Sequence, residues 1–192
     1  MKNILKNRWA LSTVVTTLII LVVSVLLAGV VTYFAINVTS TRVQEESLHL
    51  TKQHVWYGQN ASESEQDKKW VAQGAIMIIN TGGRDVVIDK ITVRGQECAW
   101  DNVYYNVTTE SISDDLTFQE ELKQSMNMEI GSKEYTFVKA SGDLTLQSGK
   151  TMIIYIHQPD SITVNDIGLT VAITIFTSQA MYYKETNVQA IA

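Results

Sequence analysis

The chain has 192 residues, with 15 basic and 20 acidic side chains and a formal net charge of −5. Before residue 42 the only charged side chains are Lys2, Lys6 and Arg8, so the rest of the chain carries 12 basic against 20 acidic residues, a net charge of −8. This acidic balance argues against nucleic acid as a partner, because binding phosphates needs a basic patch. The length predicts one globular domain after the apolar N-terminal segment.

The first predicted element is a transmembrane helix. Residues 11–36 form a run of 26 residues without a charge, and a helix needs about 20 such residues to span a bilayer. Lys2, Lys6 and Arg8 precede the run. The positive-inside rule therefore predicts that residues 1–10 lie in the cytoplasm and that the chain after the helix lies outside the cell.

A seven-residue repeat predicts that this helix continues past the membrane to residue 50. Ile36, Val43 and Leu50 recur at that spacing, with Ser40 and Ser47 between them, which would place all five on one helical face. A helix over residues 11–50 would be about 60 Å long, twice a hydrocarbon core of roughly 30 Å. We therefore expect the far half to be covered by the chain's own β domain or by the same helix of neighbouring copies.

Small side chains also recur along the helix, at mostly four-residue steps. Such a stripe allows helices to approach closely in lipid. The alternative is that the pattern reflects the ordinary composition of transmembrane helices, and the sequence leaves both interpretations open. The predicted helix packing stripe consists of Thr13, Thr17, Ser24, Ala28, Thr32 and Ala35.

The basic leader, the Arg8-Trp9-Ala10 junction and the run LSTVVTTLIILVVSVLLAGVV resemble the class III signal peptide of archaeal type IV pilins and archaellins. In that family a prepilin peptidase cuts just before the hydrophobic stretch, and the exposed helix packs with others into a filament core. The resemblance implies a leader of residues 1–10, cleavage between Ala10 and Leu11, and a homopolymer joined through N-terminal helices. Trp9 stands where the family usually has a basic residue, and Val15 where its bacterial branch has a glutamate.

The polar residues 51–69 predict a linker, and residues 70–192 predict an extracellular β domain. Its first predicted unit is a hairpin formed by residues 70–80 and 85–93, around the turn Thr81-Gly82-Gly83-Arg84. The two glycines would supply the positive φ angles of a tight turn.

The rest of the domain predicts an all-β antiparallel sandwich of immunoglobulin-like type, with about eight short strands and turn signals between them. The clearest alternation has Leu169, Val171, Ile173 and Ile175 on the core face. Residues 110–131 predict either a short helix or a long loop. The further predicted strands are residues 98–108, 135–139, 144–146, 151–157, 168–177 and 181–188.

The sequence predicts no catalytic, cofactor-binding or metal site, and the protein is not expected to be an enzyme. The histidines and paired acids lack the spacing of zinc and calcium sites. No glycine-rich phosphate loop and no nucleophile elbow occurs. We expect a solvated acidic surface at the paired carboxylates. The residues concerned are His49, His54 and His157, Asp114 with Asp115, and Glu120 with Glu121.

Three further residues carry predictions of their own. Cys98 is the only cysteine, so no intrachain disulfide can form, and it is expected to be a small buried hydrophobe. Asn60 and Asn106 begin Asn-x-Ser/Thr sequences and are candidate glycosylation sites outside the cell. Asn37 fits the same pattern, but it lies where the helix would leave the membrane, and we expect it to be too crowded to be modified.

Taken with the resemblance, these features predict a structural subunit of an archaeal type IV pilin-like surface filament, for adhesion or surface contact. It would enter the cytoplasmic membrane as a precursor and then join an extracellular filament. The alternative is a single-pass, signal-anchored binding or envelope protein that does not polymerise. A minor component of an archaellum or pilus machine would share the same features, and an extracellular enzyme is the least favoured class.

Overall fold

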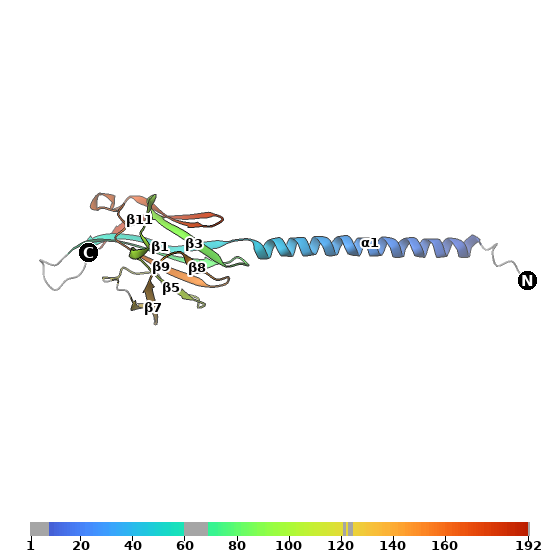
Figure 1. The fold of residues 1–192 in the computed structure, drawn as a ribbon, viewed down its shortest axis with the longest axis horizontal. Coiled ribbons are helices and arrows are strands. Elements are labelled where there is room, and N and C mark those ends of the chain that lie inside the picture. The colour runs from blue at the N-terminus through green and yellow to red at the C-terminus, as the bar shows by residue number, and fades with distance from the viewer. Residues whose placement is uncertain (1–7, 60–68, 121, 123–124, 192) are drawn as a thin grey trace, which may run out of the picture. The chain divides into compact units, whose positions relative to one another are not determined.

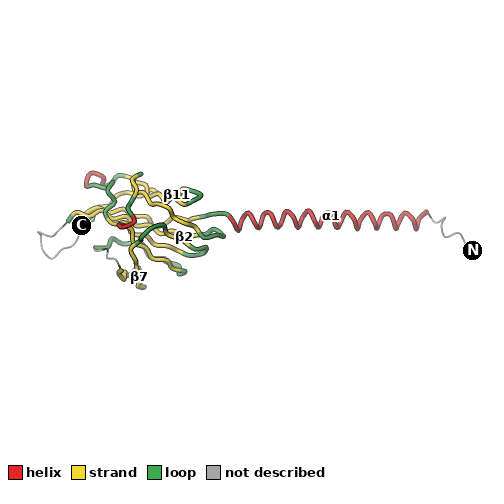
Figure 2. Tube along the Cα trace, in the orientation of Figure 1, coloured by secondary structure: helices red, strands yellow, loops and turns green. Residues whose placement is uncertain are grey.

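The computed structural model describes residues 8–59, 69–120, 122 and 125–191. The chain divides into two compact units, Met1–Val43 and Gln44–Ala192. The first contains the long helix α1, Arg8–Gln44, and the second contains the strands (Figures 1 and 2). The leader residues 1–7 lie outside the described part of the chain.

Helix α1 forms from a segment rich in Val, Ile and Thr because its own backbone and hydroxyl groups can be satisfied within the helix. The hydroxyls of Thr16, Ser24 and Thr32 donate to the carbonyls four residues earlier, at 2.7–2.9 Å. Such internal bonding is what a helix requires where water is excluded.

The prediction that the helix reaches residue 50 is wrong. It ends at Gln44, and Leu48–Gln59 form strand β1. Leu48 and Leu50 are buried on either side of an exposed His49, which is the two-residue period of a strand. The seven-residue pattern therefore did not extend the helix, because burial of these leucines in the β core takes precedence.

The predicted linker is also wrong for residues 51–59, which belong to β1, and its residues 60–68 lie outside the described part. The remaining strands follow in chain order: β2 Trp70–Asn80, β3 Val86–Val93, β4 Gln96–Glu97, β5 Val103–Thr108, β6 Ser125–Ile130, β7 Lys133–Lys139, β8 Leu144–Leu146, β9 Thr151–His157, β10 Thr170–Thr177 and β11 Met181–Ala190. Short 3-10 turns, η2 Trp100–Asn102 and η3 Val164–Asp166, precede β5 and β10.

The strands form one hydrogen-bonded path in the order β4-β3-β10-β11-β1-β2-β9-β5-β7-β6, with β8 paired to β3. The pairs are antiparallel except β1 with β11, which run parallel. The main core joins side chains from β2 and β9 to side chains from β3 and β10, so the path folds into two facing layers. Its fully buried isoleucines include Ile76, Ile154, Ile88 and Ile173. The predicted fold class, a long apolar helix followed by a β-sandwich, is confirmed.

A second apolar cluster covers the opposite face of β2 and β9. Ala75, Met77, Ile153 and Tyr155 of these strands pack against the β6–β7 hairpin and residues 112–122. Both strands are therefore buried on both faces, which explains why their sequences read as nearly continuous apolar runs.

The predicted hairpin of residues 70–80 and 85–93 is wrong, although both strands exist. β2 pairs with β1 and β9, whereas β3 pairs with β10, β4 and β8, so the turn between them carries the chain from one layer to the other. Gly82 is not among the positive-φ residues. It is suited to its position for a different reason: a Cβ there would lie 2.7 Å from the Glu45 carbonyl oxygen and 2.8 Å from the Ser47 nitrogen.

Other strand predictions are confirmed in part. Val171, Ile173 and Ile175 alternate into the core as expected, but Leu169 precedes β10 and is half exposed. Residues 98–102 are not a strand, since η2 occupies their end. Strands β1, β4 and β6 were not predicted. Within residues 110–131 the described part is a loop followed by β6, and not a helix.

Cys98 is buried in the main core, as predicted. Burial raises the pKa of its thiol to about 11, so the thiolate is scarce at neutral pH.

Candidate functional site

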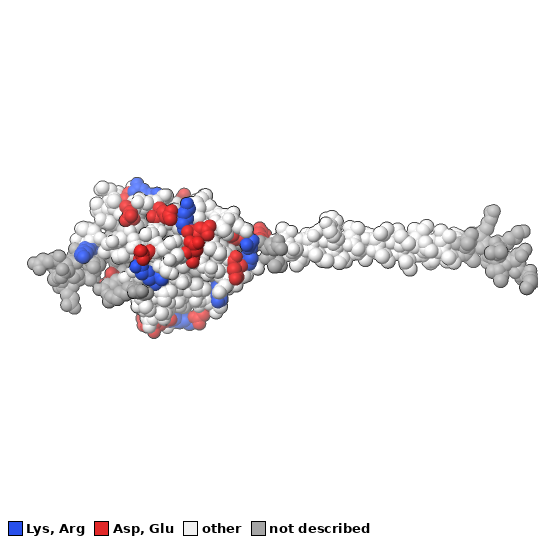
Figure 3. Space-filling model, in the orientation of Figure 1, with Lys and Arg blue, Asp and Glu red and all other residues white. Residues whose placement is uncertain are grey.

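The largest exposed apolar surface of the described chain is that of α1. Residues Ser12–Thr41 contain no charged side chain and meet the length and composition of a membrane span. The same properties fit a membrane anchor or a signal sequence. Every side chain of this stretch is exposed in the structure, and the part of α1 drawn in white in Figure 3 carries no charged side chain. Its large apolar side chains include Leu18, Ile20, Leu26, Val31 and Phe34.

The six residues of the predicted packing stripe lie along one side of this exposed surface. At 3.6 residues per turn, their positions fall within a sector of about 100°. The hydroxyls of Thr17, Ser24 and Thr32 donate to carbonyls of their own helix, so they do not need solvent or a partner to be satisfied. The stripe is therefore both small and internally satisfied, which suits close approach of a second helix.

The backbone of the predicted cleavage junction, Ala10 and Leu11, is helical and lies in the first turn of α1. The side chains of these two residues are outside the described part. Asn37 is exposed near the other end of α1, and Asn60 is not described.

Asn106 is held within the β domain and is not a free surface asparagine. It lies in β5, where its Nδ2 donates to the Thr136 carbonyl at 2.7 Å. Its Oδ1 is buried and has no hydrogen-bond partner among the residues that the structure describes. A glycan is attached through Nδ2, so modification of the folded domain would compete with the bond to Thr136.

Of the histidines and acids predicted to form no metal site, His54 lies beside Asp115, whereas His49 and His157 lie elsewhere on β1 and β9. Among the described residues there is no group of three His, Cys, Asp or Glu side chains placed to hold a metal ion. Asp114, Asp115 and Glu120 are exposed, as expected, and Glu121 is not described. His49 is exposed on β1, while burial of His157 on β9 lowers its pKa.

Residues 110–120, for which the sequence left a helix or a loop open, form an extended segment over the face of β1, β2 and β9 that carries the second apolar cluster. The attachment of this segment to the sheet was not predicted. We call the segment the strap. Its side chain Leu116 is buried, and Ile112 and Phe118 pack beside it on the second apolar cluster. The strap forms no ladder with those strands, so its backbone groups need other partners.

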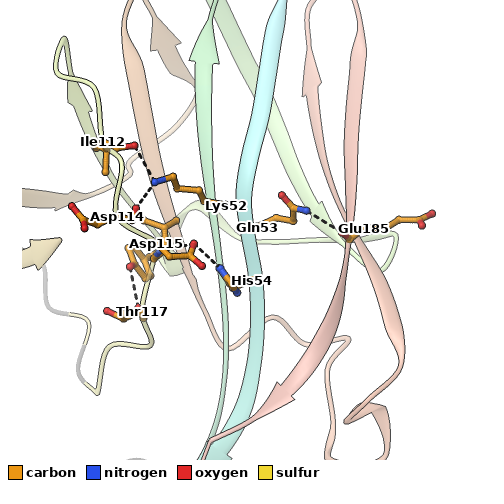
Figure 4. Close-up of polar contacts among 10 residues, drawn as sticks. Lys52, Gln53, His54, Ile112, Asp114, Asp115, Thr117 and Glu185 are labelled. Atoms are coloured by element: carbon orange, nitrogen blue, oxygen red, sulfur yellow. Dashed lines mark hydrogen bonds and ion pairs between the residues drawn. The ribbon is translucent and has the colours of Figure 1, made fainter. Parts of the chain in front are cut away.

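Side chains from three neighbouring strands supply those partners. From β1, the Lys52 ammonium donates to the carbonyls of Ile112 and Asp114 (Figure 4). From β2, Gln73 exchanges two hydrogen bonds with the backbone of Gln119, at 2.8 and 3.0 Å. Side chains of β1 and β2 thereby fix the backbone of the strap to the sheet.

Two further side chains, one on β9 and one on β1, also contact the strap. The buried Tyr155 hydroxyl donates to the Thr117 carbonyl at 3.0 Å, and burial raises the pKa of Tyr155 to about 12. His54 Nε2 lies 2.9 Å from an oxygen of Asp115 (Figure 4). The His54 ring stacks on Trp56, with the ring centroids 5.1 Å apart.

Partial burial opposes ionisation of Asp115. Hydrogen bonds from His54 and the Leu116 N–H, together with the nearby charges of His54 and Lys52, outweigh it and hold the pKa of the Asp115 carboxyl below its ordinary value.

A local bulge on β1 aims this set of side chains. The pairing register with β2 shifts between Thr51 and His54, and Lys52 adopts a positive φ of 52°. Lys52 and His54 then point to the strap, while Gln53 points the other way and donates to the Glu185 carbonyl of β11 (Figure 4). The polar character of residues 51–54, which suggested a linker, is explained by these contacts.

An open cavity of about 470 Å³ lies where β5 and β7 diverge, with Asn106, Glu134 and Lys150 among its walls. Glu110 on its rim lies 2.7 Å from the Lys133 ammonium, and that hydrogen bond lowers the pKa of the Glu110 carboxyl. A carboxylate paired in this way is a poor general base.

Comparisons with known proteins give no family for this chain. No protein-family profile matches it, and no curated protein matches it. Among solved structures it is similar to the GH20 exo-β-N-acetylglucosaminidase of Vibrio harveyi, as an inactive mutant and in complex with N-acetylglucosamine. In both, identity is 12%, the TM-score is 0.20, and the match covers 73% of this chain and 18% of the hydrolase. Nothing about this chain's fold or activity follows from a likeness at that score.

Proposed function

We propose that this chain is a structural subunit of an archaeal type IV pilin-like surface filament, assembled through α1 and presenting the β domain for adhesion or surface contact. The observation that carries the proposal is the exposure of every side chain from Ser12 to Thr41. Burying one large aliphatic side chain contributes about 1.5–3 kcal/mol, so a stretch this long is strongly driven to a nonaqueous partner. Lipid would cover it first, and α1 of neighbouring copies would cover it in the filament.

Two sequence features support polymerisation over simple anchoring. One is the resemblance of the leader and the Ala10–Leu11 junction to a class III signal peptide, which would make a prepilin peptidase a transient partner. The other is the stripe of small residues on α1, which a lipid anchor does not need. Asn60 and Asn106 are proposed as glycosylation sites of the exported subunit, with Asn106 modified before its Nδ2 bonds to the Thr136 carbonyl in the folded domain.

A signal-anchored monomer is the second candidate. Trp9, in the position usually taken by a basic residue, favours it, because retention of the leader would keep α1 in the membrane. The two functions need different things from α1, since spanning lipid requires only apolar side chains whereas filament packing also requires small ones on the contact face.

The experiment replaces Ala28 in the stripe by Leu and compares it with Leu27→Ile off the stripe, in cells that make the native protein. Overpacking costs about 1–3 kcal/mol per site and would recur at every subunit contact. We expect Ala28→Leu to insert normally in the membrane and to abolish filaments seen by electron microscopy, with Leu27→Ile close to wild type. Equal filament yields from both variants, with both inserted, would exclude packing through the stripe.

A further inference from the structure

The three residues between α1 and β1 are held by two turns of the β domain. The Ser47 carbonyl accepts hydrogen bonds from the N–H groups of Thr81 and Gly82, at 2.9 and 3.1 Å, and from the Thr81 hydroxyl at 3.2 Å. The hydroxyls of Ser47 and Thr81 lie 3.0 Å apart. Ser47 thus holds Thr81 and Gly82 at the start of the turn that follows β2.

Residues on either side of the second turn, between β10 and β11, hold Glu46, the residue before Ser47. The Thr177 hydroxyl donates to the Glu46 carboxylate, and the Tyr182 hydroxyl donates to the Glu46 carbonyl at 3.3 Å. We call this set the entry clamp; it consists of Glu46, Ser47, Thr81, Gly82, Thr177 and Tyr182.

The entry clamp is tightly packed as well as hydrogen-bonded. A Cβ on Gly82 would lie within 2.8 Å of backbone atoms of Glu45 and Ser47, a separation that real Cβ atoms do not show. Tyr182 packs against the main core. The segment that enters the domain is therefore fixed before the first strand begins.

Strand β1 then continues into the middle of the strand path. It is paired along its length with β2, and its residues Val55–Tyr57 are paired in parallel with β11. An edge strand would have one neighbour, whereas β1 has two. Strand β11 runs parallel to β1 and ends at Ala190. Tension between the chain before Glu45 and the chain after β11 therefore pulls these two neighbouring strands from opposite ends, along their axes. Antiparallel ladder bonds lie perpendicular to the strand, so such a pull strains many of them together and not one after another.

We propose that the entry clamp and β1 form a mechanical lock that keeps the β domain folded when tension reaches it through α1. The lock rests on α1 being the tether, which is common to the filament and the anchored monomer, and it does not depend on polymerisation. Any adhesion through the β domain would load the chain along this route.

The test is force spectroscopy on the single full-length chain in detergent micelles. One handle is attached to a cysteine replacing Thr41 and the other to a cysteine added after Ala192. Cys98 can stay, because its thiol is buried and its pKa is about 11. A second geometry places the handles at Asp143→Cys and Asp160→Cys, which are exposed and lie on neither α1 nor β1.

The informative variant is Thr81→Val with Tyr182→Phe, which removes two hydroxyls of the entry clamp and keeps side-chain shape. Thr170→Val with Tyr183→Phe is the matched control, since both hydroxyls lie outside the clamp. Through Thr41, we expect the unfolding rate at constant force to rise about tenfold in the clamp variant, the effect of about one net hydrogen bond, and not in the control. Through Asp143 and Asp160 the clamp variant should match wild type.

The lock is refuted if the clamp variant unfolds no faster than the control through Thr41. It is also refuted if the variant is accelerated equally in both geometries, since the clamp would then contribute only to general stability. If the double variant does not fold, Tyr182→Phe against Tyr183→Phe makes the same comparison. A failure to find filaments leaves these single-chain results unchanged.

Discussion

Helix α1 and the central strands of the β domain are rich in the same types of apolar residue, but these residues lie in opposite environments. Ile20, Leu21 and Val25 of α1 are more than half exposed, whereas Ile76, Ile154 and Ile156 of β2 and β9 are fully buried. The β domain buries its apolar residues against itself. In α1 every side chain from Ser12 to Thr41 is exposed, so the apolar surface of this helix is not buried within the helix itself.

The comparison predicts that the β domain folds without α1 but not without β1. A chain starting at Glu45 should be soluble and β-rich by circular dichroism. A chain starting at Lys69 should remain unfolded, because it lacks the strand between β2 and β11 and the buried Leu48, Leu50 and Val55. Adding a peptide of residues 45–59 should restore folding of the shorter chain. A folded chain from Lys69 alone would contradict the importance given to β1.

The next effect concerns single side chains in the two regions. Ile154→Ala leaves a cavity in the main core and should lower the free energy of unfolding by about 2–5 kcal/mol. Ile20→Ala, the same change on exposed α1, should leave unfolding of the β domain unchanged. Urea denaturation of the full chain in detergent, followed by near-ultraviolet circular dichroism, measures both. Equal losses would show that α1 packs on the β domain.

The local stability of the strap should be lower than that of the core, and it should depend on the side chains that anchor the strap. Lys52→Met removes the donor to the carbonyls of Ile112 and Asp114 and should destabilise the strap by about 1–3 kcal/mol. Hydrogen exchange of residues 110–120 should quicken, while β2 and β9 stay protected. Lys184→Met, on the exposed face of β11, is the control. Unchanged exchange in the strap would show that Lys52 does not hold it.

The smallest effect is the pH dependence of the strap. The folded pKa of Asp115 lies below its ordinary value, so its ionisation stabilises the fold above an unfolded pKa of about 3.9, and this stabilisation is lost as pH falls through the folded pKa. Because Asp115 is exposed, we expect less than about 1 kcal/mol. Protection factors of the strap amides, which correct for the slower intrinsic exchange in acid, should fall below pH 4 in the native chain, and this change should shrink in Asp115→Asn. An identical acid response in both would assign it to another carboxylate.

The sequence predicts best those elements whose signal is local. The uncharged run of α1 and the apolar runs of β2 and β9 identify a helix and buried strands because burial or lipid leaves few alternatives. The alternation of Val171, Ile173 and Ile175 identifies β10 for the same reason.

Pairing and polar anchoring are less predictable because they depend on residues far apart in the chain. β2 and β3 have a turn between them and still join different layers, since each finds a better partner elsewhere. Strand β1 reads as a linker because Lys52 and Gln53 bond to the strap and to β11, contacts that lie 60 or more residues away. The sequence signal for β1 was a polar stretch flanked by apolar residues, with Leu48 and Leu50 before it and Val55-Trp56-Tyr57 after it.

The most direct test of the account is the state of the protein on its own cells. Surface filaments sheared from those cells would be imaged by electron microscopy, and their subunit analysed by intact mass and N-terminal sequencing. We expect filaments built from this chain, beginning at Leu11 with α1 enclosed among neighbouring copies. Recovery of the chain only from the membrane fraction, at full length from Met1 and without any filament that contains it, would contradict assembly and leave the anchored monomer.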